Sequence, residues 1–248
     1  MDNNNIIKGR GAQYNPQNPF DKRGLSHEDT DGIDVPVDHN TPTQYFHDQP
    51  KTIINKVDSP DIGHAYSMNP YQGCEHGCIY CYARNTHNYY GFSAGIDFEQ
   101  KIIIKDNAAA VLEKQLQNPN WEVRPIMLSG NTDCYQPIER KLRITRKILE
   151  VLLKYRHPVS ILTKNNLILR DLDILQEMAK NDLVHAAVTI TSLDETIRRK
   201  LEPRTARASK RLEVLEQLTA ANIPTTVMVS PVIPGLTDHE IPAIIEAA

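Results

Sequence analysis

Short apolar runs alternate with longer segments of helical spacing from about residue 63 to the carboxyl terminus. Five runs predict β-strands, at residues 64–68, 124–130, 159–164, 184–191 and 225–230. All but the first are mostly apolar and rich in β-branched residues, which is typical of strands buried on both faces of a parallel sheet. The alternation therefore indicates a series of βα units and an α/β fold.

The segments between these runs place apolar residues on one helical face. They predict four helices, around residues 112–116, 145–152, 172–178 and 212–218. Asp171 stands directly before the third helix and is a candidate N-cap. A last helix is expected to begin with a capping box of Thr237 and Glu240, although Pro242 can shift its first residue.

The number of βα units limits the architecture. Five units do not close an eight-stranded barrel, so we expect an open, partial barrel. Because the chain stops at Ala248 within a helical pattern, we also expect it to be incomplete at its carboxyl end.

Residues 1–62 have a different composition from the rest of the chain. They are rich in Asn, Asp, Pro, Gln and Gly, and their apolar residues are too scattered for helical or strand periodicity. We expect an irregular N-terminal arm over residues 1–62 and the partial barrel over residues 63–248.

The overall composition excludes several classes of protein. The chain has 248 residues, 40% of them hydrophobic and 24% charged, which is typical of a globular protein with one large or two small domains. No apolar run approaches the roughly 20 residues of a membrane helix, so no membrane association is expected. The net charge of −3 gives no overall attraction to nucleic acid. The amino terminus resembles neither a secretory signal nor a transit peptide, which predicts a cytoplasmic protein.

Three of the four cysteines lie close together, just after the first predicted strand. Cys74 and Cys78 are separated by three residues, and Cys78 and Cys81 by two. Gly73 and Gly77 allow the loop to curl so that the three sulfur atoms converge. This position at the carboxyl end of a strand is where βα folds place their active sites, so a metal-binding role is favoured over disulfides.

Three interpretations of this cysteine group remain open. His76 could complete a zinc site with the three thiolates, although its spacing is crowded for one tetrahedral ion. The cysteines could be buried without a ligand, which is improbable for three in one Gly-rich loop. The third interpretation is a [4Fe-4S] cluster with three protein thiolates and one open iron.

Around these cysteines the sequence resembles the radical S-adenosylmethionine (radical SAM) superfamily, which shares the cysteine spacing and an aromatic residue, here Tyr80, before the last cysteine. The resemblance covers most of the chain from about residue 52 onward. Within that superfamily, the sequence is similar to a bacterial branch related to the spore photoproduct lyase group. The segments that carry this similarity are NPYQGCEHGCIYCYAR, LSGNTDCYQPIER, LTKNNLILRDLD, LEPRTARASKRL and SPVIPGLTD.

The resemblance implies a partial (β/α)6-type barrel and a specific chemistry. Cys74, Cys78 and Cys81 would hold a [4Fe-4S] cluster whose open iron binds S-adenosylmethionine. Electron transfer from the cluster would cleave S-adenosylmethionine and form a 5′-deoxyadenosyl radical, which abstracts hydrogen from a substrate. A low-potential electron donor of the flavodoxin or ferredoxin type would be the partner.

The resemblance also implies which side chains contact S-adenosylmethionine. Its methionine amino group would meet the turn after the second predicted strand, where the usual Glu is missing and Asp133 could supply the charge. Its carboxylate would meet Lys164, and Cys134 could donate hydrogen to a product radical. The cofactor-binding residues expected in this way are Tyr80, Ser129, Gly130, Asn131, Thr132, Lys164, Thr189, Thr191 and Arg211.

Each of these assignments competes with a structural role. The turn could be an ordinary strand-to-helix connection, and Lys164 a solvated lysine. Thr189 and Thr191 could be present for their strand propensity, and Cys134 could have no catalytic role.

A basic segment lies between the fourth predicted strand and the helix after it. It consists of Arg198, Arg199, Lys200, Arg204, Arg207, Lys210 and Arg211. Such a segment could line a phosphate groove, but basic runs are usually solvated and no aromatic residues are interleaved for base stacking. The alternative to an enzyme is therefore a structural zinc-binding module that docks nucleic acid, and a third possibility is an inactive fragment.

Overall fold

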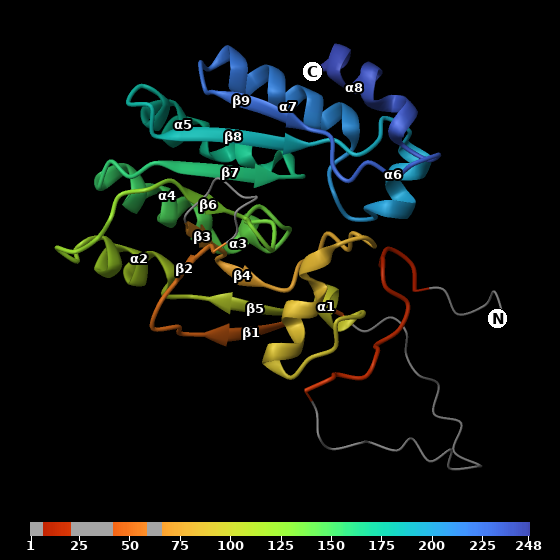
Figure 1. Ribbon diagram of the computed structural model, residues 1–248, viewed down its shortest axis with the longest axis horizontal. Coiled ribbons are helices and arrows are strands. Elements are labelled where there is room, and N and C mark those ends of the chain that lie inside the picture. Colours follow the sequence, from red (N-terminus) through yellow and green to blue (C-terminus); the bar gives the residue numbers. More distant parts are fainter. Residues whose placement is uncertain (1–6, 21–41, 59–65) are drawn as a thin grey trace.

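The computed structural model describes residues 7–20, 42–58 and 66–248, and its main feature is a six-stranded sheet (Figure 1). The strands follow the order β2 (Ile54–Lys56), β3 (Tyr66–Met68), β6 (Ile126–Leu128), β7 (Val159–Thr163), β8 (Val184–Thr189) and β9 (Thr225–Met228). β3, β6, β7, β8 and β9 are parallel, and β2 pairs antiparallel with β3.

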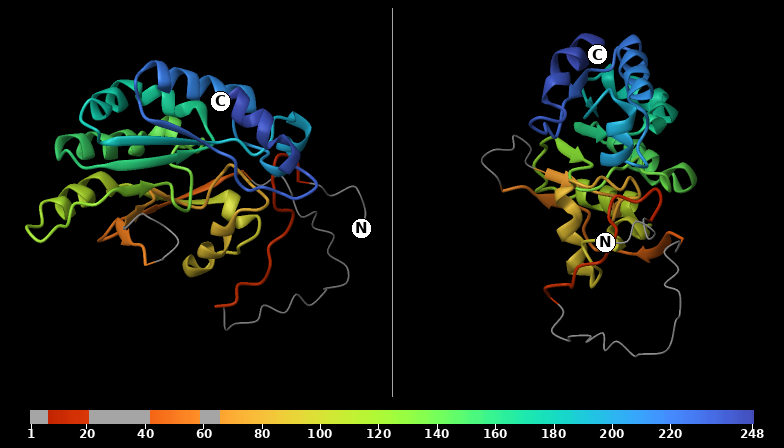
Figure 2. Two further views of the ribbon diagram at one scale, coloured as in Figure 1. Left: turned by 45° about the horizontal axis from the view of Figure 1, so that its top comes forward. Right: turned by 90° about the vertical axis from the view of Figure 1, so that its right-hand side faces the viewer.

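Helices connect the parallel strands. They pack on one side of the sheet, which is curved (Figure 2). The α-helices are α1 (Asp97–Gln100), α2 (Ala108–Leu116), α3 (Glu139–Leu142), α4 (Ile144–Lys154), α5 (Leu172–Ala179), α6 (Glu195–Leu201), α7 (Ala208–Ala220) and α8 (Ile241–Ala247). Three 3-10 segments, η1 (Tyr82–Tyr90), η2 (Asn166–Asp171) and η3 (Asp238–Glu240), occupy connecting loops.

The apolar pattern explains this arrangement. Ile148, Leu149 and Leu152 of α4 are buried on one face, as are Leu175 and Met178 of α5. They pack against the buried side chains of the strands in one continuous core. The amphipathic helices therefore bury their apolar faces on the sheet, as the sequence pattern predicts.

The five predicted strands and the helices between them are confirmed, the strands with shorter bounds and the helices with longer ones. The first prediction began at residue 64, and its first two residues lie outside the described part of the chain. Asp171 occupies the N-cap position of α5, but its side chain makes no capping bond. Instead the carboxylate accepts hydrogen bonds from Arg146 and Arg170.

A second sheet was not predicted from the sequence. It has three strands in the order β1 (Gln44–Asp48), β5 (Lys101–Lys105) and β4 (Tyr71–Gln72). β1 and β5 are parallel, and β4 is antiparallel to β5. The prediction of an irregular arm therefore does not hold at residues 44–48 or 54–56, where strands form through pairing with distant segments.

The capping box predicted for the last helix is wrong. Glu240 precedes α8 but its carboxylate accepts bonds from the hydroxyl of Ser192 at 2.7 Å and the backbone N–H of Leu193 at 2.6 Å. Thr237 Oγ1 accepts a bond from Ile233 N. Pro242 lies in the first turn of α8, where its missing N–H costs no helical bond.

The two sheets meet where the chain passes directly from β3 into β4. Within the described ranges, none of the helices has the length and apolar character needed to cross a bilayer.

Candidate active site

The cysteine loop, residues 73–82, follows β4 at the junction of the two sheets. Cys74, Cys78 and Cys81 carry free thiols, of which Cys74 is buried and the other two are partly buried. Cys74 and Cys81 pack with Ala83 and Phe98 in a small apolar group separate from the main core. The loop thus brings thiols to the carboxyl ends of the parallel strands.

Two glycines with positive φ allow the loop to turn close to its neighbours. A Cβ on Gly73 would lie 2.9 Å from the carbonyl oxygen of Lys101, and one on Gly77 would lie 2.7 Å from Glu99 Oε2. The backbone therefore approaches β5 and α1 more closely than a larger residue permits.

Glu75 and Gln136 fasten the loop to the segment after β6. Glu75 N donates to Gln136 Oε1 at 3.0 Å, and Gln136 Nε2 donates to the carbonyl of Gly73 at 3.2 Å. The Glu75 carboxylate accepts a bond from Ile138 N at 2.9 Å. Gln136 is fully buried, and its two hydrogen bonds fix the backbone on both sides of Cys74.

His76 is engaged by protein groups on both sides of its ring. Its Nδ1 lies 3.4 Å from Asp133 Oδ2, and its Nε2 lies 3.1 Å from Asn165 Nδ2. Asp133 also accepts bonds from Thr163 Oγ1 and from the backbone N–H of Lys164. Burial raises the pKa of Asp133, but His76 and the backbone N–H groups of Lys164 and Tyr135 outweigh it, so the pKa is lowered overall.

Burial dominates the acidity of the three thiols. It raises the pKa of Cys78 to about 12, with Glu202 adding to the shift and Lys164 opposing it. Burial also raises the pKa of Cys81 and that of Cys74, and the charge of Asp133 raises the pKa of Cys74 further. The thiols are therefore uncharged at neutral pH, and a metal that bound them would have to displace their protons.

The predicted turn of residues 129–132 is shaped mainly by its own polar groups. Ser129 Oγ accepts a bond from Cys134 N at 2.8 Å, and Thr132 Oγ1 donates to the carbonyl of Tyr71 at 2.7 Å. Asn131 N and Thr132 N both donate to Asn69 Oδ1. The side chain of Asn131 is partly exposed and makes no hydrogen bond within the described part of the chain.

Gly130 lies so close to Ser67 that a larger residue would have to displace the Ser67 hydroxyl. A Cβ there would lie 2.6 Å from Ser67 Oγ, and the carbonyl of Gly130 accepts a bond from the hydroxyl of Tyr82. The turn therefore connects the residue after Cys81 with the end of β6.

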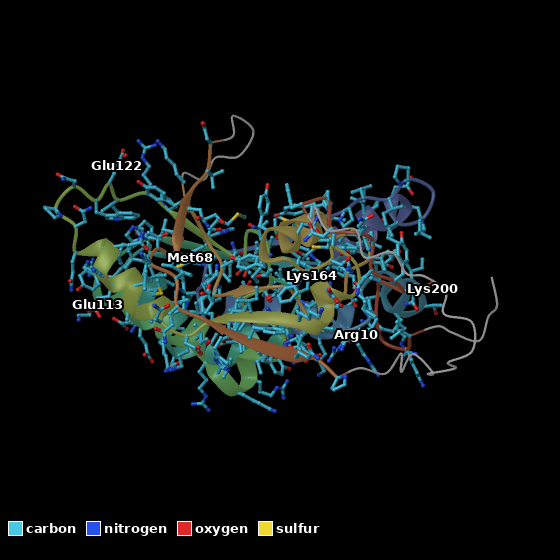
Figure 3. All side chains as sticks on the ribbon, turned by 90° about the horizontal axis from the view of Figure 1, so that it is seen from below. Arg10, Met68, Glu113, Glu122, Lys164 and Lys200 are labelled. Atoms are coloured by element: carbon cyan, nitrogen blue, oxygen red, sulfur yellow. The ribbon has the colours of Figure 1, made fainter. Side chains whose placement is uncertain are left out.

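Lys164 directly follows β7, and its side chain is partly exposed. Its ammonium lies 6.0 Å from the centre of the Tyr80 ring and forms neither a hydrogen bond nor an ion pair with any described residue. Figure 3 places Lys164 toward the same end of the molecule as Arg10 and Lys200, away from Glu113 and Glu122. The site thus contains one cation that is available to an anionic ligand.

Glu202 is the centre of a buried polar network at the end of β8. Its carboxylate accepts bonds from Thr191 Oγ1 at 2.7 Å, from Arg211 Nη2 at 2.5 Å and from the Tyr80 hydroxyl. Burial raises the pKa of Glu202, but Arg211 and Lys164 outweigh it and lower the pKa to about 2. The predicted site residues Tyr80, Thr191 and Arg211 therefore meet on one carboxylate.

Arg211 is 1% exposed and all of its described contacts are with protein. Besides Glu202, its guanidinium donates to the carbonyls of Ala206 and Thr189, each at 2.8 Å. Thr189 itself is fully buried, and its hydroxyl has no hydrogen-bond partner among the described residues.

Cys134 is fully buried within the main core. Its carbonyl accepts a bond from Thr145 Oγ1 at 2.6 Å, and burial raises the pKa of its thiol. The structure places it apart from the apolar group that contains Cys74 and Cys81.

The basic segment does not form one continuous exposed surface. Arg198 is buried, with bonds to Glu195 and to the carbonyls of Glu202 and Thr205. Arg211 is also buried, and Lys210 pairs with Glu213. The exposed cations of the segment are Arg199, Lys200, Arg207 and Lys210.

The donor set favours a sulfur-ligated metal group over a zinc site completed by His76. Three thiols lie on one loop, and His76 would have to give up Asp133 and Asn165 to bind a metal. Among the described residues, no three His, Cys, Asp or Glu side chains are gathered around a single metal position. Three soft thiolates are ligands that iron–sulfur clusters use.

Sequence reasoning missed the residues that shape the site from behind. Asn69, Gln136, Glu99 and Glu202 are buried polar residues that hold the loop, the turn or the end of β8. A weak signal existed for Glu202, which interrupts the basic segment with an opposite charge. The others are single polar residues whose partners lie far away in the sequence.

Comparison with known proteins finds a matching family and related sequences. A family model described as the radical SAM superfamily matches residues 68–248. An uncharacterized protein of Mycobacterium tuberculosis is 38% identical over 189 residues, covering 76% of this chain and 56% of that protein. An uncharacterized protein of Methanocaldococcus jannaschii is 32% identical over 190 residues, covering 77% of this chain and 68% of that protein. The chain thus spans little more than half of the mycobacterial relative.

Solved structures show the same fold. Spore photoproduct lyase in complex with dinucleoside spore photoproduct has a TM-score of 0.60 at 18% identity. The matched region covers 82% of this chain and 58% of the lyase chain. A mutant of that enzyme with bound AdoMet (S-adenosylmethionine) and dinucleoside spore photoproduct has a TM-score of 0.56 at 17% identity, covering 75% and 50%. The predicted α/β partial barrel is confirmed.

Proposed function

This chain belongs to the radical SAM superfamily, and from that premise we propose that it is an enzyme that binds a [4Fe-4S] cluster through Cys74, Cys78 and Cys81 and cleaves S-adenosylmethionine. The observation that carries the proposal is the cysteine loop, which presents three free thiols beside Lys164 at the carboxyl ends of the parallel strands. When bound and reduced, such a cluster supplies the electron that splits the sulfonium into methionine and a 5′-deoxyadenosyl radical.

In this proposal Lys164 binds the carboxylate of S-adenosylmethionine. Its ammonium has no partner among the described residues, and an anionic group would therefore gain an ion pair without breaking one. Asn131 is the side chain of the turn left free to bind the methionine amino group. Asp133 is less suited to that role because its carboxylate already accepts bonds from Thr163 and the backbone.

The end of β8 contributes a second set of contacts. The hydroxyl of Thr189 is buried without a partner, so a ribose hydroxyl that reached it would satisfy both groups. Arg211 and Thr191 serve indirectly, because both bind Glu202 and through it hold the Tyr80 hydroxyl. We assign them as positioning residues.

The burial of Cys74 also serves the reaction. A reactive radical must be kept from water, and the apolar group around Phe98 excludes water from one side of the loop. The electron would come from a low-potential protein of the flavodoxin or ferredoxin type, and the radical would abstract hydrogen from a substrate.

Replacing one cysteine at a time tests the proposal. Anaerobically reconstituted protein is expected to bind about four irons and to convert S-adenosylmethionine into methionine and 5′-deoxyadenosine when reduced. Cys78→Ala should lose the cluster and with it all detectable cleavage, because three thiolates are needed to hold it.

Cys134→Ala is the matched control. This thiol lies in the main core, so its removal should leave iron binding intact. Cleavage that persists in Cys78→Ala would refute the ligand assignment. One zinc per chain without acid-labile sulfide would instead favour the structural zinc module.

A further inference from the structure

We propose that Glu99 is the positioning residue of the cysteine loop and that the N-terminal segment, residues 7–20, completes the cluster site as a strap. The inference rests on the proposed function for the identity of the bound group. In Figures 1 and 2 this segment, drawn in red, runs beside η1 and α1, which are distant from it in the sequence.

Glu99 is a fully buried carboxylate in the short helix α1. It accepts bonds from the backbone N–H groups of Gly11 at 3.0 Å and Ala12 at 2.7 Å, and from Arg84 Nη2 at 2.6 Å. Two of these three donors belong to the strap. Loss of such donors costs more free energy for a buried carboxylate than for an exposed carboxylate. The strap and Glu99 therefore stabilise each other.

Arg84 transmits this arrangement to the cysteine loop. The same Nη2 that pairs with Glu99 lies 2.8 Å from the carbonyl oxygen of Cys78, and Nε lies 3.2 Å from it. Nη1 donates to the carbonyl of Gly95, and the guanidinium lies 5.5 Å from the centre of the Phe98 ring. The backbone of a cluster ligand is thus held by a guanidinium that Glu99 orients.

The strap also touches the loop directly. A Cβ on Gly11 would lie only 1.9 Å from the carbonyl oxygen of Gly77, so only glycine permits this approach. On its other side the loop is held by Ile79 N, which donates to the carbonyl of Leu201 at 3.0 Å. The stretch from Gly77 to Ile79 therefore contacts the strap, Glu99 and the end of α6.

Further bonds fix the rest of the strap on α1 and the residues before it. Asn15 and Asp97 form a reciprocal pair, with Asn15 Nδ2 donating to the carboxylate at 2.8 Å and Asp97 N donating to Asn15 Oδ1 at 2.9 Å. Ser93 Oγ donates to the carbonyl of Pro16, and Asn18 Nδ2 donates to the carbonyl of Asn88. This number of directional bonds is more than a loosely attached tail requires.

The strap has a consequence that plain fold stabilisation lacks. Its bonds converge on the loop that contains Cys78, while the main core contains none of its side chains. Releasing the strap should therefore loosen the cysteine loop and leave the barrel folded.

The test uses the full-length chain with two variants. Gly11→Ala displaces the strap because the added methyl would clash with the carbonyl of Gly77, and Glu99→Gln removes the charge. In iron-free protein, amide hydrogen exchange in residues 74–84 should accelerate about ten-fold or more in both variants. In reconstituted protein, iron release to a chelator should accelerate similarly and the line shape of the reduced cluster's EPR signal should change. The melting temperature should shift by no more than about 4 °C for Gly11→Ala.

Tyr14→Ala is the matched control, because the Tyr14 side chain is 73% exposed and its removal leaves the strap backbone in place. The proposal is overturned if Gly11→Ala behaves like Tyr14→Ala in exchange and iron release. It is also overturned if exchange rises equally in α5 and α7, since the role would then be global. Failure of the wild type to bind iron would refute the proposed function, while exchange in the iron-free protein would still decide this inference.

Discussion

Glu202 shows how a single buried charge can organise a site. It is 0% exposed and binds Tyr80, Thr191 and Arg211 at once. Because its pKa falls from 4.5 to about 2 in the folded chain, the stability it contributes is present above pH 4.5 and is lost as the pH falls toward 2.

Glu202→Gln tests this linkage. The variant should unfold with a free energy roughly 3 kcal/mol lower than the wild type at pH 7, and the difference should shrink as the pH falls from 5 toward about 2. Urea unfolding of iron-free protein over this pH range measures it, with the exposed Glu216→Gln of α7 as control. A difference that is independent of pH would contradict the assigned ionisation.

At this scale the sequence pointed to the proposed cluster ligands more clearly than to the residues that support their loop. Cys74, Cys78 and Cys81 lie within one loop, so their spacing alone predicts convergence. Arg211 and Lys164 are both cations at strand or helix ends, and only the folded chain separates them. Arg211 is buried on Glu202, whereas the ammonium of Lys164 has no partner among the described residues.

At the scale of the elements, local pattern predicted the parallel strands because each carries its own apolar run. β1 and β4 lack such a run and form through their pairing with β5. β5 contains three consecutive isoleucines, a signal that was present in the sequence but too short to separate a strand from a helix. The capping box failed for a similar reason, because Glu240 binds Ser192 from a distant loop.

Ile104→Ala tests whether the small sheet is part of the main core. Ile104 is 2% exposed in β5 and packs in the same core as β3 and β6. Its truncation should lower the free energy of unfolding by about 3 kcal/mol, since a buried cavity replaces the side chain. Ile245→Ala in α8 is the control, because that side chain is 61% exposed. Equal effects in urea unfolding would place the small sheet outside the cooperative core.

At the scale of the whole molecule, the cysteine loop lies where three separate parts of the chain meet. β4 begins the loop at the junction of the sheets, the segment after β6 holds it through Gln136, and the strap covers Gly77. The sequence predicts the loop and the barrel, but it cannot predict this assembly, because each contact joins residues more than 60 positions apart.

The central claim is that these parts together hold an iron–sulfur cluster with an iron open to S-adenosylmethionine. The most direct test is the EPR spectrum of the anaerobically reconstituted, dithionite-reduced protein, recorded with and without S-adenosylmethionine. We predict a [4Fe-4S]⁺ signal whose shape changes when S-adenosylmethionine is added. An EPR-silent, colourless protein that retains one zinc, or a cluster signal that S-adenosylmethionine leaves unchanged, would contradict the claim.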